Sequence, residues 1–162
     1  IKISKSLSNL LAAESQIFSP SKTSVEIKKF YDRVYKVIER FSLEIQKFQG
    51  SENLIWGYTA PAKATTWLAS LPPDIRQSIN FVIDDSPLKQ GMYIPGTNIP
   101  IFSSDYVQTK LDVDLELFRT KSLGIIFSWN IVDSLLAKLA QENIGSGRYL
   151  VPLPEVRVVT ST

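Results

Sequence analysis

The stretch Leu54-Ile55-Trp56-Gly57-Tyr58-Thr59-Ala60-Pro61-Ala62-Lys63 places a short apolar run directly before a polar turn and the start of a helical pattern. We interpret residues 53–56 as a buried strand and residues 60–70 as the helix that follows it. Pro61 fits the first turn of that helix, where a backbone amide needs no partner. The stretch therefore predicts a strand, a connection and a helix, which is the repeating unit of an α/β fold.

Short apolar runs and helical patterns alternate through the rest of the chain. Further strands are predicted at residues 79–83, 99–102, 123–128 and 148–151, and an edge strand at 156–159. Further helices are predicted at residues 105–119 and 131–142. Alternation of this kind indicates a mostly parallel sheet of about five strands with helices on both faces. We therefore expect a three-layer α/β domain over residues 23–162.

A long amphipathic helix is predicted ahead of the first strand. Thr23 and Glu26 fit a capping box, in which each side chain satisfies a free amide of the first turn. Apolar residues then recur at spacings of three and four from Ile27 to Phe48, and Gly50 ends the pattern. This helix either packs on its own sheet or also docks a neighbouring domain.

The amino-terminal segment, residues 1–22, is polar and rich in Ser. We expect it to be a connector that contains a short helix ending near Glu14. The chain starts at Ile1 rather than at a Met, which suggests a piece of a longer protein.

The composition excludes several classes of function. Hydrophobic residues make up 44% of the chain and charged residues 21%, as in an ordinary globular protein. The chain contains no His and no Cys, so it supplies no imidazole base, zinc–thiolate site or disulfide. A net charge of +2 without blocks of like charge argues against nucleic-acid binding. Because no signal peptide or membrane-length apolar run is visible, we expect a cytoplasmic protein without membrane contact.

The turn after the first predicted strand can hold an anion. Gly57 permits a tight turn or close backbone approach, and Thr59 can cap the following helix. The start of that helix offers free amides and a partial positive charge, to which Lys63 adds a cation. With one glycine, the turn matches neither common phosphate-loop motif, and a plain turn with a solvated Lys stays the alternative. The candidate substrate-binding residues here are Gly57, Tyr58, Thr59, Ala60 and Lys63.

A second polar loop follows the strand predicted at 79–83. Asp84 and Asp85 end that strand, where an acidic residue of nucleotide-binding sheets often accepts a ribose hydroxyl. The alternative is that both residues cap turns before Pro87. Gly91 and Gly96 open the rest of the loop, which carries several side-chain donors and can close over a ligand. The candidates here are Asp84, Lys89, Gln90 and Tyr93.

The dipeptide Trp129-Asn130 ends the strand predicted at 123–128, at the same edge of the sheet. Asn130 is either the N-cap of the next helix or a ligand contact. Trp129 is either part of the core or a stacking surface. We take both as candidate substrate-binding residues.

Four motifs together resemble the C-terminal domain of the sugar C-methyltransferases, which act on nucleotide-linked deoxysugars. They are G-Y-x-A-P-A-K at 57–63, D-x-S-P-x-K-Q-G-x-Y-x-P-G-T-x-I-P-I at 84–101, W-N at 129–130 and P-x-P-E-x-R at 152–157. The resemblance runs from about Leu10 to Val159. The chain departs from it at Thr59, where the family usually has Gly.

The resemblance implies a Rossmann-like domain that helps to hold a nucleotide-diphosphate sugar. An amino-terminal zinc-binding region and a central S-adenosylmethionine domain would precede it in the parent protein. The methyl donor and the acid/base residues would then belong mainly to that central domain, so we expect neither catalytic residues nor a cofactor in this segment. A non-catalytic module for another nucleotide-like metabolite is the alternative. The single Gly57 and the small size disfavour a complete dinucleotide-dependent oxidoreductase.

Overall fold

The structure of the protein is a computed structural model that describes residues 5–17, 20–50, 53–109, 111 and 114–161. Side chains are described for the same residues except 5–7, 16–17 and 20–23. The chain divides into two compact units, Ile1–Lys36 and Val37–Thr162. The second unit contains the sheet and all of the predicted site residues.

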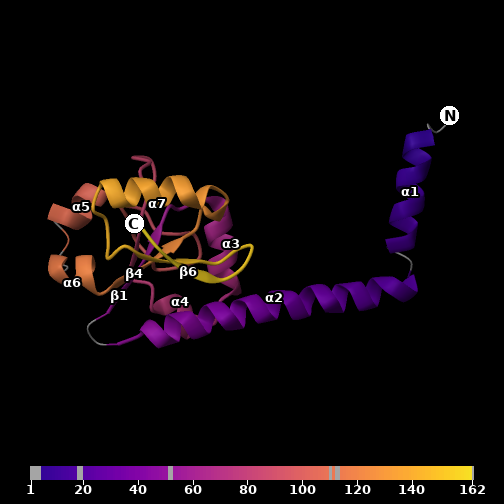
Figure 1. The fold of residues 1–162 in the computed structure, drawn as a ribbon, viewed down its shortest axis with the longest axis horizontal. Helices are drawn as coiled ribbons and strands as arrows, with labels where there is room; N and C mark the ends of the chain where they lie inside the picture. The colour runs from indigo at the N-terminus through magenta and orange to yellow at the C-terminus, as the bar shows by residue number, and fades with distance from the viewer. Residues whose placement is uncertain (1–4, 18–19, 51–52, 110, 112–113, 162) are drawn as a thin grey trace. The chain divides into compact units, whose positions relative to one another are not determined.

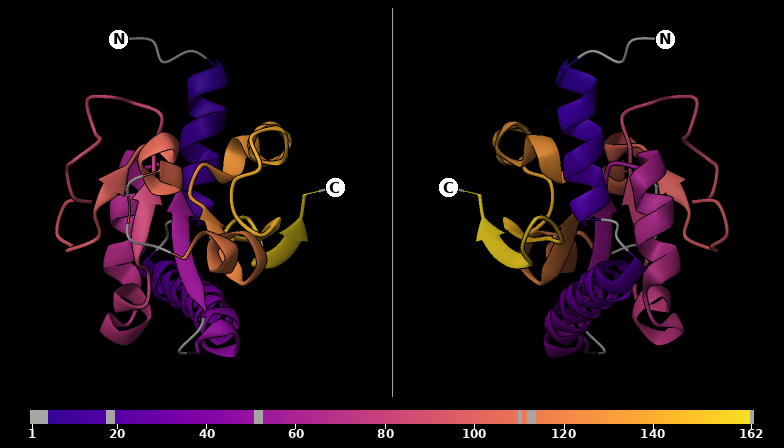
Figure 2. Two further views of the ribbon diagram at one scale, coloured as in Figure 1. Left: turned by 90° about the vertical axis from the view of Figure 1, so that its left-hand side faces the viewer. Right: turned by 90° about the vertical axis from the view of Figure 1, so that its right-hand side faces the viewer.

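A six-stranded sheet lies at the centre of the unit Val37–Thr162. Its strands are β1 (Leu54–Tyr58), β2 (Phe81–Ile83), β3 (Ile101–Phe102), β4 (Ser122–Ile126), β5 (Arg148–Val151) and β6 (Arg157–Thr160). Their order is β3-β2-β1-β4-β5-β6, with β6, the yellow strand in Figure 2, at one edge. Strands β1 to β5 are parallel, whereas β6 pairs antiparallel with β5. The mostly parallel sheet confirms the predicted α/β class, and its order is consistent with a Rossmann-like fold.

Helices cover both faces of the sheet (Figure 1). On one face lie α3 (Ala62–Ser70), α4 (Pro73–Gln77) and the carboxyl-terminal part of α2 (Pro20–Phe48). On the other lie α5 (Ser104–Thr109), α6 (Leu115–Thr120) and α7 (Val132–Gln141), which follows the short 3-10 helix η1 (Trp129–Ile131). The three-layer arrangement follows because the central strands are apolar on both sides and must be covered twice.

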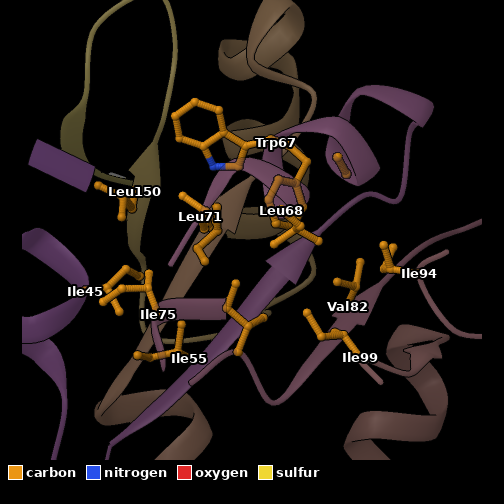
Figure 3. Packing of buried hydrophobic residues seen from close by; sticks show 14 of the residues in the cluster. Ile45, Ile55, Trp67, Leu68, Leu71, Ile75, Val82, Ile94, Ile99 and Leu150 are labelled. Atoms are coloured by element: carbon orange, nitrogen blue, oxygen red, sulfur yellow. The ribbon is translucent and has the colours of Figure 1, made fainter. Parts of the chain in front are cut away.

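Alternation along β1 divides the core into two clusters. Ile55 belongs to the cluster on the α3 side, whereas Trp56 and Tyr58 belong to the cluster on the α7 side. Figure 3 shows the first cluster, in which Leu68 and Val82 pack among other buried aliphatic side chains. The carboxyl end of each central strand is thereby fixed between two apolar layers.

Gly57 lies within β1 rather than in the turn that follows it, so of its two expected roles the tight turn is not observed. A Cβ built here would come within 2.4 Å of the Phe127 ring and 2.8 Å of Val82. Glycine therefore serves close packing of β1 against these two side chains.

Two predicted helices differ from the observed ones at their boundaries. Helix α2 begins at Pro20, so Thr23 lies inside the helix and the capping box does not start it. Proline suits the first helical position because it lacks an amide that would need a partner. The helix predicted at 105–119 is divided into α5 and α6, and Asp114 caps α6 by accepting from the amides of Glu116 and Leu117.

In the unit Ile1–Lys36, α1 (Lys5–Ile17) extends past the predicted end near Glu14. The predicted loop that leads to Pro20 includes residues 18–19, which lie outside the described residues. Large apolar side chains of this unit are exposed by about half or more: Leu10, Val25, Ile27, Phe30, Tyr31 and Tyr35. Within the described ranges, no helix has the length and apolar character needed to cross a membrane.

Candidate functional site

The carboxyl ends of β1, β2 and β4 meet at one edge of the sheet, and the strand order reverses between β1 and β4. Ligands of open α/β sheets bind outside this edge. The amide of Ala60 donates to Oδ2 of Asp84 over 2.6 Å and joins β1 to β2. The hydroxyls of Thr59 and Ser128 are 2.7 Å apart and join β1 to β4. We call residues 57–63, 84–90 and 128–130 the carboxyl edge.

Asp84 is the centre of the bonds between these loops. Its side chain is buried and accepts from the amides of Ala60 and Ser86, at 2.6 and 2.9 Å, and from Lys89 Nζ at 3.1 Å. Burial alone would raise the pKa of Asp84, but the two amides and Lys89 outweigh it and lower the pKa. The bond from the Ser86 amide, two residues on, is the turn cap that we kept as the alternative for Asp84.

Asp85 has a different environment from its neighbour. Its side chain is exposed, and its Oδ2 accepts from the Tyr58 hydroxyl at 3.1 Å and from Lys138 Nζ at 2.7 Å. Burial raises the pKa of Tyr58 to about 12, and the Asp85 charge adds to this. The hydrogen bond to Asp85 raises the pKa of Lys138. At neutral pH Tyr58 is therefore a neutral donor and Lys138 a charged one.

Lys63 lies over the crossing from β1 to β4. Its Nζ donates to Oδ1 of Asn130 and lies 4.4 Å from the centre of the Trp129 ring. Trp129 in turn packs edge-on against Trp67 of α3, with 6.4 Å between ring centres. Lys89 and Lys138 are each paired with an aspartate, whereas among the described residues Lys63 contacts no carboxylate. Lys63 is therefore the cation of this edge that is available to an anion.

The N-cap of α3 is not the residue that we expected from the sequence. The helix begins at Ala62, its N-cap is Pro61, and no side chain bonds to its first turn. Thr59 is not the cap, because its hydroxyl is bound to Ser128. The backbone of Thr59 has φ +32°, in the region that favours glycine.

The first-turn amides of α3 are the other donors of this edge. Within the described part of the chain, no protein group accepts from the amides of Ala62 and Lys63. The Ala60 amide, by contrast, is taken by Asp84. The anion-binding capacity that the sequence predicted thus begins at Ala62.

The loop after β2 is held closely to the body of the domain. Lys89 binds the Asp84 side chain, and Gln90 Nε2 donates to the Asp84 carbonyl at 3.0 Å. Tyr93 is exposed and pairs with Pro100 in an isolated bridge, away from the bonds that join the three strand ends. The structure therefore brings Lys89 and Gln90 to the carboxyl edge, whereas among the described residues no side-chain hydrogen bond joins Tyr93 to the other candidates.

Three further candidates have roles in packing or backbone structure. Gly57 and Tyr58 are buried in β1, where the Tyr58 ring joins the core and presents its hydroxyl to Asp85. Asn130 lies in η1 and does not cap α7, whose N-cap Ile131 makes no side-chain bond. Contact of any of these residues with a ligand stays a prediction.

Sequence reasoning missed Ser128 of the carboxyl edge and Lys138 of α7, which binds Asp85 of that edge. Ser128 lies at the end of the strand predicted at 123–128, so a search for hydroxyls at strand ends would have found it. Lys138 carried no local signal, because it lies on α7 and reaches Asp85 across 53 positions of sequence.

Two cavities open at the opposite edge of the sheet. One of about 440 Å³ is lined by Arg76 and Thr97, among others, next to the starts of β2 and β3. Another of about 500 Å³ is lined by Asn53, Ser122 and Arg148, at the starts of β1, β4 and β5. Neither includes a residue of the carboxyl edge.

The residues of this chain do not fit the zinc ion or S-adenosylmethionine that the resemblance implies for a parent protein. The sequence has no His and no Cys, and its described residues form no acidic group able to hold a metal. The connection from β1 to α3 lacks a glycine-rich loop, since Gly57 lies inside the strand. No chemical step through either group can therefore be derived for this segment.

Comparison with known proteins agrees with this description. The C-methyltransferase NovU of Streptomyces niveus is 30% identical to the chain over 105 residues, which are 65% of this chain and 23% of NovU. The match thus spans less than a quarter of the length of that relative. A family model described as the C-methyltransferase C-terminal domain matches residues 2–154. Because this match covers nearly the whole chain, the protein belongs to the family of C-methyltransferase C-terminal domains.

Proposed function

We propose that this chain is the substrate-holding domain of an S-adenosylmethionine-dependent sugar C-methyltransferase, and that its carboxyl edge binds a nucleotide-diphosphate sugar. Methyl transfer would take place mainly in a companion domain of the same protein. The work of this domain would be positioning, because holding two reactants in attack geometry can remove several kcal/mol from a barrier. No residue of this segment needs to form a covalent bond with the substrate.

Lys63 is the observation that carries the proposal. Among the described residues, its ammonium group is not paired with a carboxylate. It also lies in the first turn of α3, where no described protein group accepts a hydrogen bond from the amides of Ala62 and Lys63. A helix amino terminus and an adjacent lysine are a suitable site for a diphosphate. Trp129, half-buried beneath Lys63, offers an aromatic face beside that site.

A companion domain is supported by the length of the relative. Neither of the two cavities described above includes a residue of the carboxyl edge, and in this proposal a second module covers the ligand there. NovU is more than four times as long as the matched segment. A Cys-rich region and an S-adenosylmethionine domain encoded upstream of Ile1 would support this arrangement, whereas an unrelated upstream domain would favour the alternative module.

Binding of thymidine diphosphate glucose to the full-length protein, measured by calorimetry, tests the proposal. Replacing Lys63 by Met should weaken binding roughly tenfold or more, because a charge-assisted hydrogen bond is lost. Lys47→Met is the matched control, since Lys47 is an exposed lysine of α2 paired with Glu44. An unchanged affinity of Lys63→Met, or no binding by the wild type at millimolar ligand, would contradict the proposal.

A further inference from the structure

The two neighbouring aspartates after β2 have different environments: Asp84 is buried and bonded within the protein, whereas Asp85 is exposed. The Asp84 side chain is 6% exposed, and both of its oxygens accept bonds from its own chain. The Asp85 side chain is 52% exposed, and its bonds to Tyr58 and Lys138 both reach Oδ2. Within the described residues, no hydrogen bond or ion pair is found at Oδ1 of Asp85. Of the pair, Asp85 is therefore the exposed residue that has an unbonded carboxylate oxygen for a ligand.

We propose that Asp85, held in place by Tyr58 and Lys138, accepts a hydrogen bond from a sugar hydroxyl of the ligand bound at the carboxyl edge. This inference rests on the function proposed above. It moves the role that sequence reasoning gave to Asp84 by one residue. The ligand chemistry is a hydroxyl of either the ribose or the hexose of a nucleotide sugar.

The support of Asp85 comes from two different elements, β1 and α7. Tyr58 ends β1 and is fully buried, so its hydroxyl is fixed by the core. Lys138 lies on α7 and brings a positive charge to the same oxygen. Two donors on Oδ2 fix the rotation of the carboxylate and leave Oδ1 as the free acceptor. A carboxylate fixed before binding loses less conformational entropy when it accepts a hydroxyl.

A surface ion pair alone does not account for this arrangement. Ion pairs between exposed side chains contribute little to stability and need no third partner. Here a buried phenol also donates to the carboxylate, at 3.1 Å, although burial alone makes an unpaired hydroxyl costly. The Tyr58 hydroxyl thus depends on Asp85 for its acceptor, and Asp85 depends on Tyr58 for its position.

The test uses Asp85→Asn in the full-length protein, with thymidine diphosphate glucose and thymidine diphosphate as separate probes in calorimetry. In the variant, the amide oxygen should turn toward the two donors, so the ligand meets an NH2 group instead of an acceptor. We expect roughly ten- to a hundredfold weaker binding. A loss with both probes assigns the hydroxyl to the ribose, and a loss restricted to thymidine diphosphate glucose assigns it to the hexose.

A second variant tests the positioning role of Tyr58. Tyr58→Phe keeps the buried ring and removes one donor to Asp85, so its loss of affinity should be smaller than that of Asp85→Asn and should concern the same probe. Thermal unfolding of both variants serves as the control for folding. Wild-type affinity of Asp85→Asn for both probes would overturn the inference while the proposed function stands. If the wild type binds neither probe, the proposed function fails and the inference fails with it.

Discussion

At the scale of single residues, the buried carboxylate of Asp84 joins the ends of β1 and β2. It accepts from the Ala60 amide after β1 and from the Ser86 amide of its own loop, and Lys89 compensates its charge. These bonds keep its pKa below the ordinary value. A carboxylate of this kind stabilises the folded state above the pKa of the unfolded chain, and the contribution is lost as pH falls through the folded pKa.

Asp84→Asn should therefore lower the free energy of unfolding at neutral pH by about 1–3 kcal/mol, because an amide cannot accept all of these bonds. The difference from wild type should begin to shrink below about pH 4, where the aspartate of the unfolded chain becomes protonated, and should shrink further as the pH falls to the lower pKa of folded Asp84. Urea denaturation at about pH 7 and about pH 3 measures both values. An equal loss at both pH values would show that the charge of Asp84 contributes nothing.

At the scale of secondary-structure elements, Thr59 lies in the connection between β1 and α3. Its positive φ is unfavourable for a side chain with a branched Cβ, yet its hydroxyl makes the bond to Ser128 that joins β1 to β4. Glycine at this position would relieve the backbone and lose the bond. Threonine at this position therefore accepts a less favourable backbone conformation and in return links two strand ends.

Two substitutions separate these effects. Thr59→Gly should change the free energy of unfolding by less than about 1 kcal/mol, because the strain and the hydrogen bond are of similar size. Thr59→Ala removes the bond and keeps the strain, so it should be less stable than Thr59→Gly by about 1 kcal/mol. Chemical denaturation of the two variants gives the difference directly. Equal stability of the two would mean that the backbone at Thr59 is not strained.

Elements were predictable where a local pattern determines them. The apolar run 148–151 is β5 as predicted, and the edge strand predicted at 156–159 is β6, displaced by one residue. The segment 105–119 is mostly helical as predicted, but it contains two helices, because Asp114 starts the second one by capping it. Its mixed polarity gave no sign of this boundary.

The sequence predicted the sheet edge at which the candidate residues lie, but it did not predict most of the contacts between them. The placement of Lys63 and Asn130 at one edge followed from strand ends, and the structure joins them directly. The different environments of Asp84 and Asp85 could not be predicted, because they depend on which side chain turns inward toward β1. The partners Ser128 and Lys138 lie 69 and 53 positions from the residues that they bind. Contacts at such separations come from the order of the strands.

At the scale of the whole molecule, the core belongs to one of the two units. Every buried apolar side chain that the structure describes lies between Phe41 and Val156. Of α2, the residues that pack in the core cluster are Phe41 and Ile45, joined by the partly buried Val37, Ile38 and Phe48. In the unit Ile1–Lys36, the apolar side chains of α2 that are named above stay exposed.

Removing residues 1–36 should therefore leave the folding of the remainder nearly intact. We expect the free energy of unfolding of residues 37–162 to differ from that of residues 1–162 by no more than about 1 kcal/mol, since the removed side chains bury little apolar surface. Urea denaturation followed by tryptophan fluorescence measures this, because Trp56, Trp67 and Trp129 all lie in the retained unit. A markedly larger loss would mean that side chains such as Phe30 and Tyr31 pack onto the domain in solution, and the exposed part of α2 would then belong to the core of this domain.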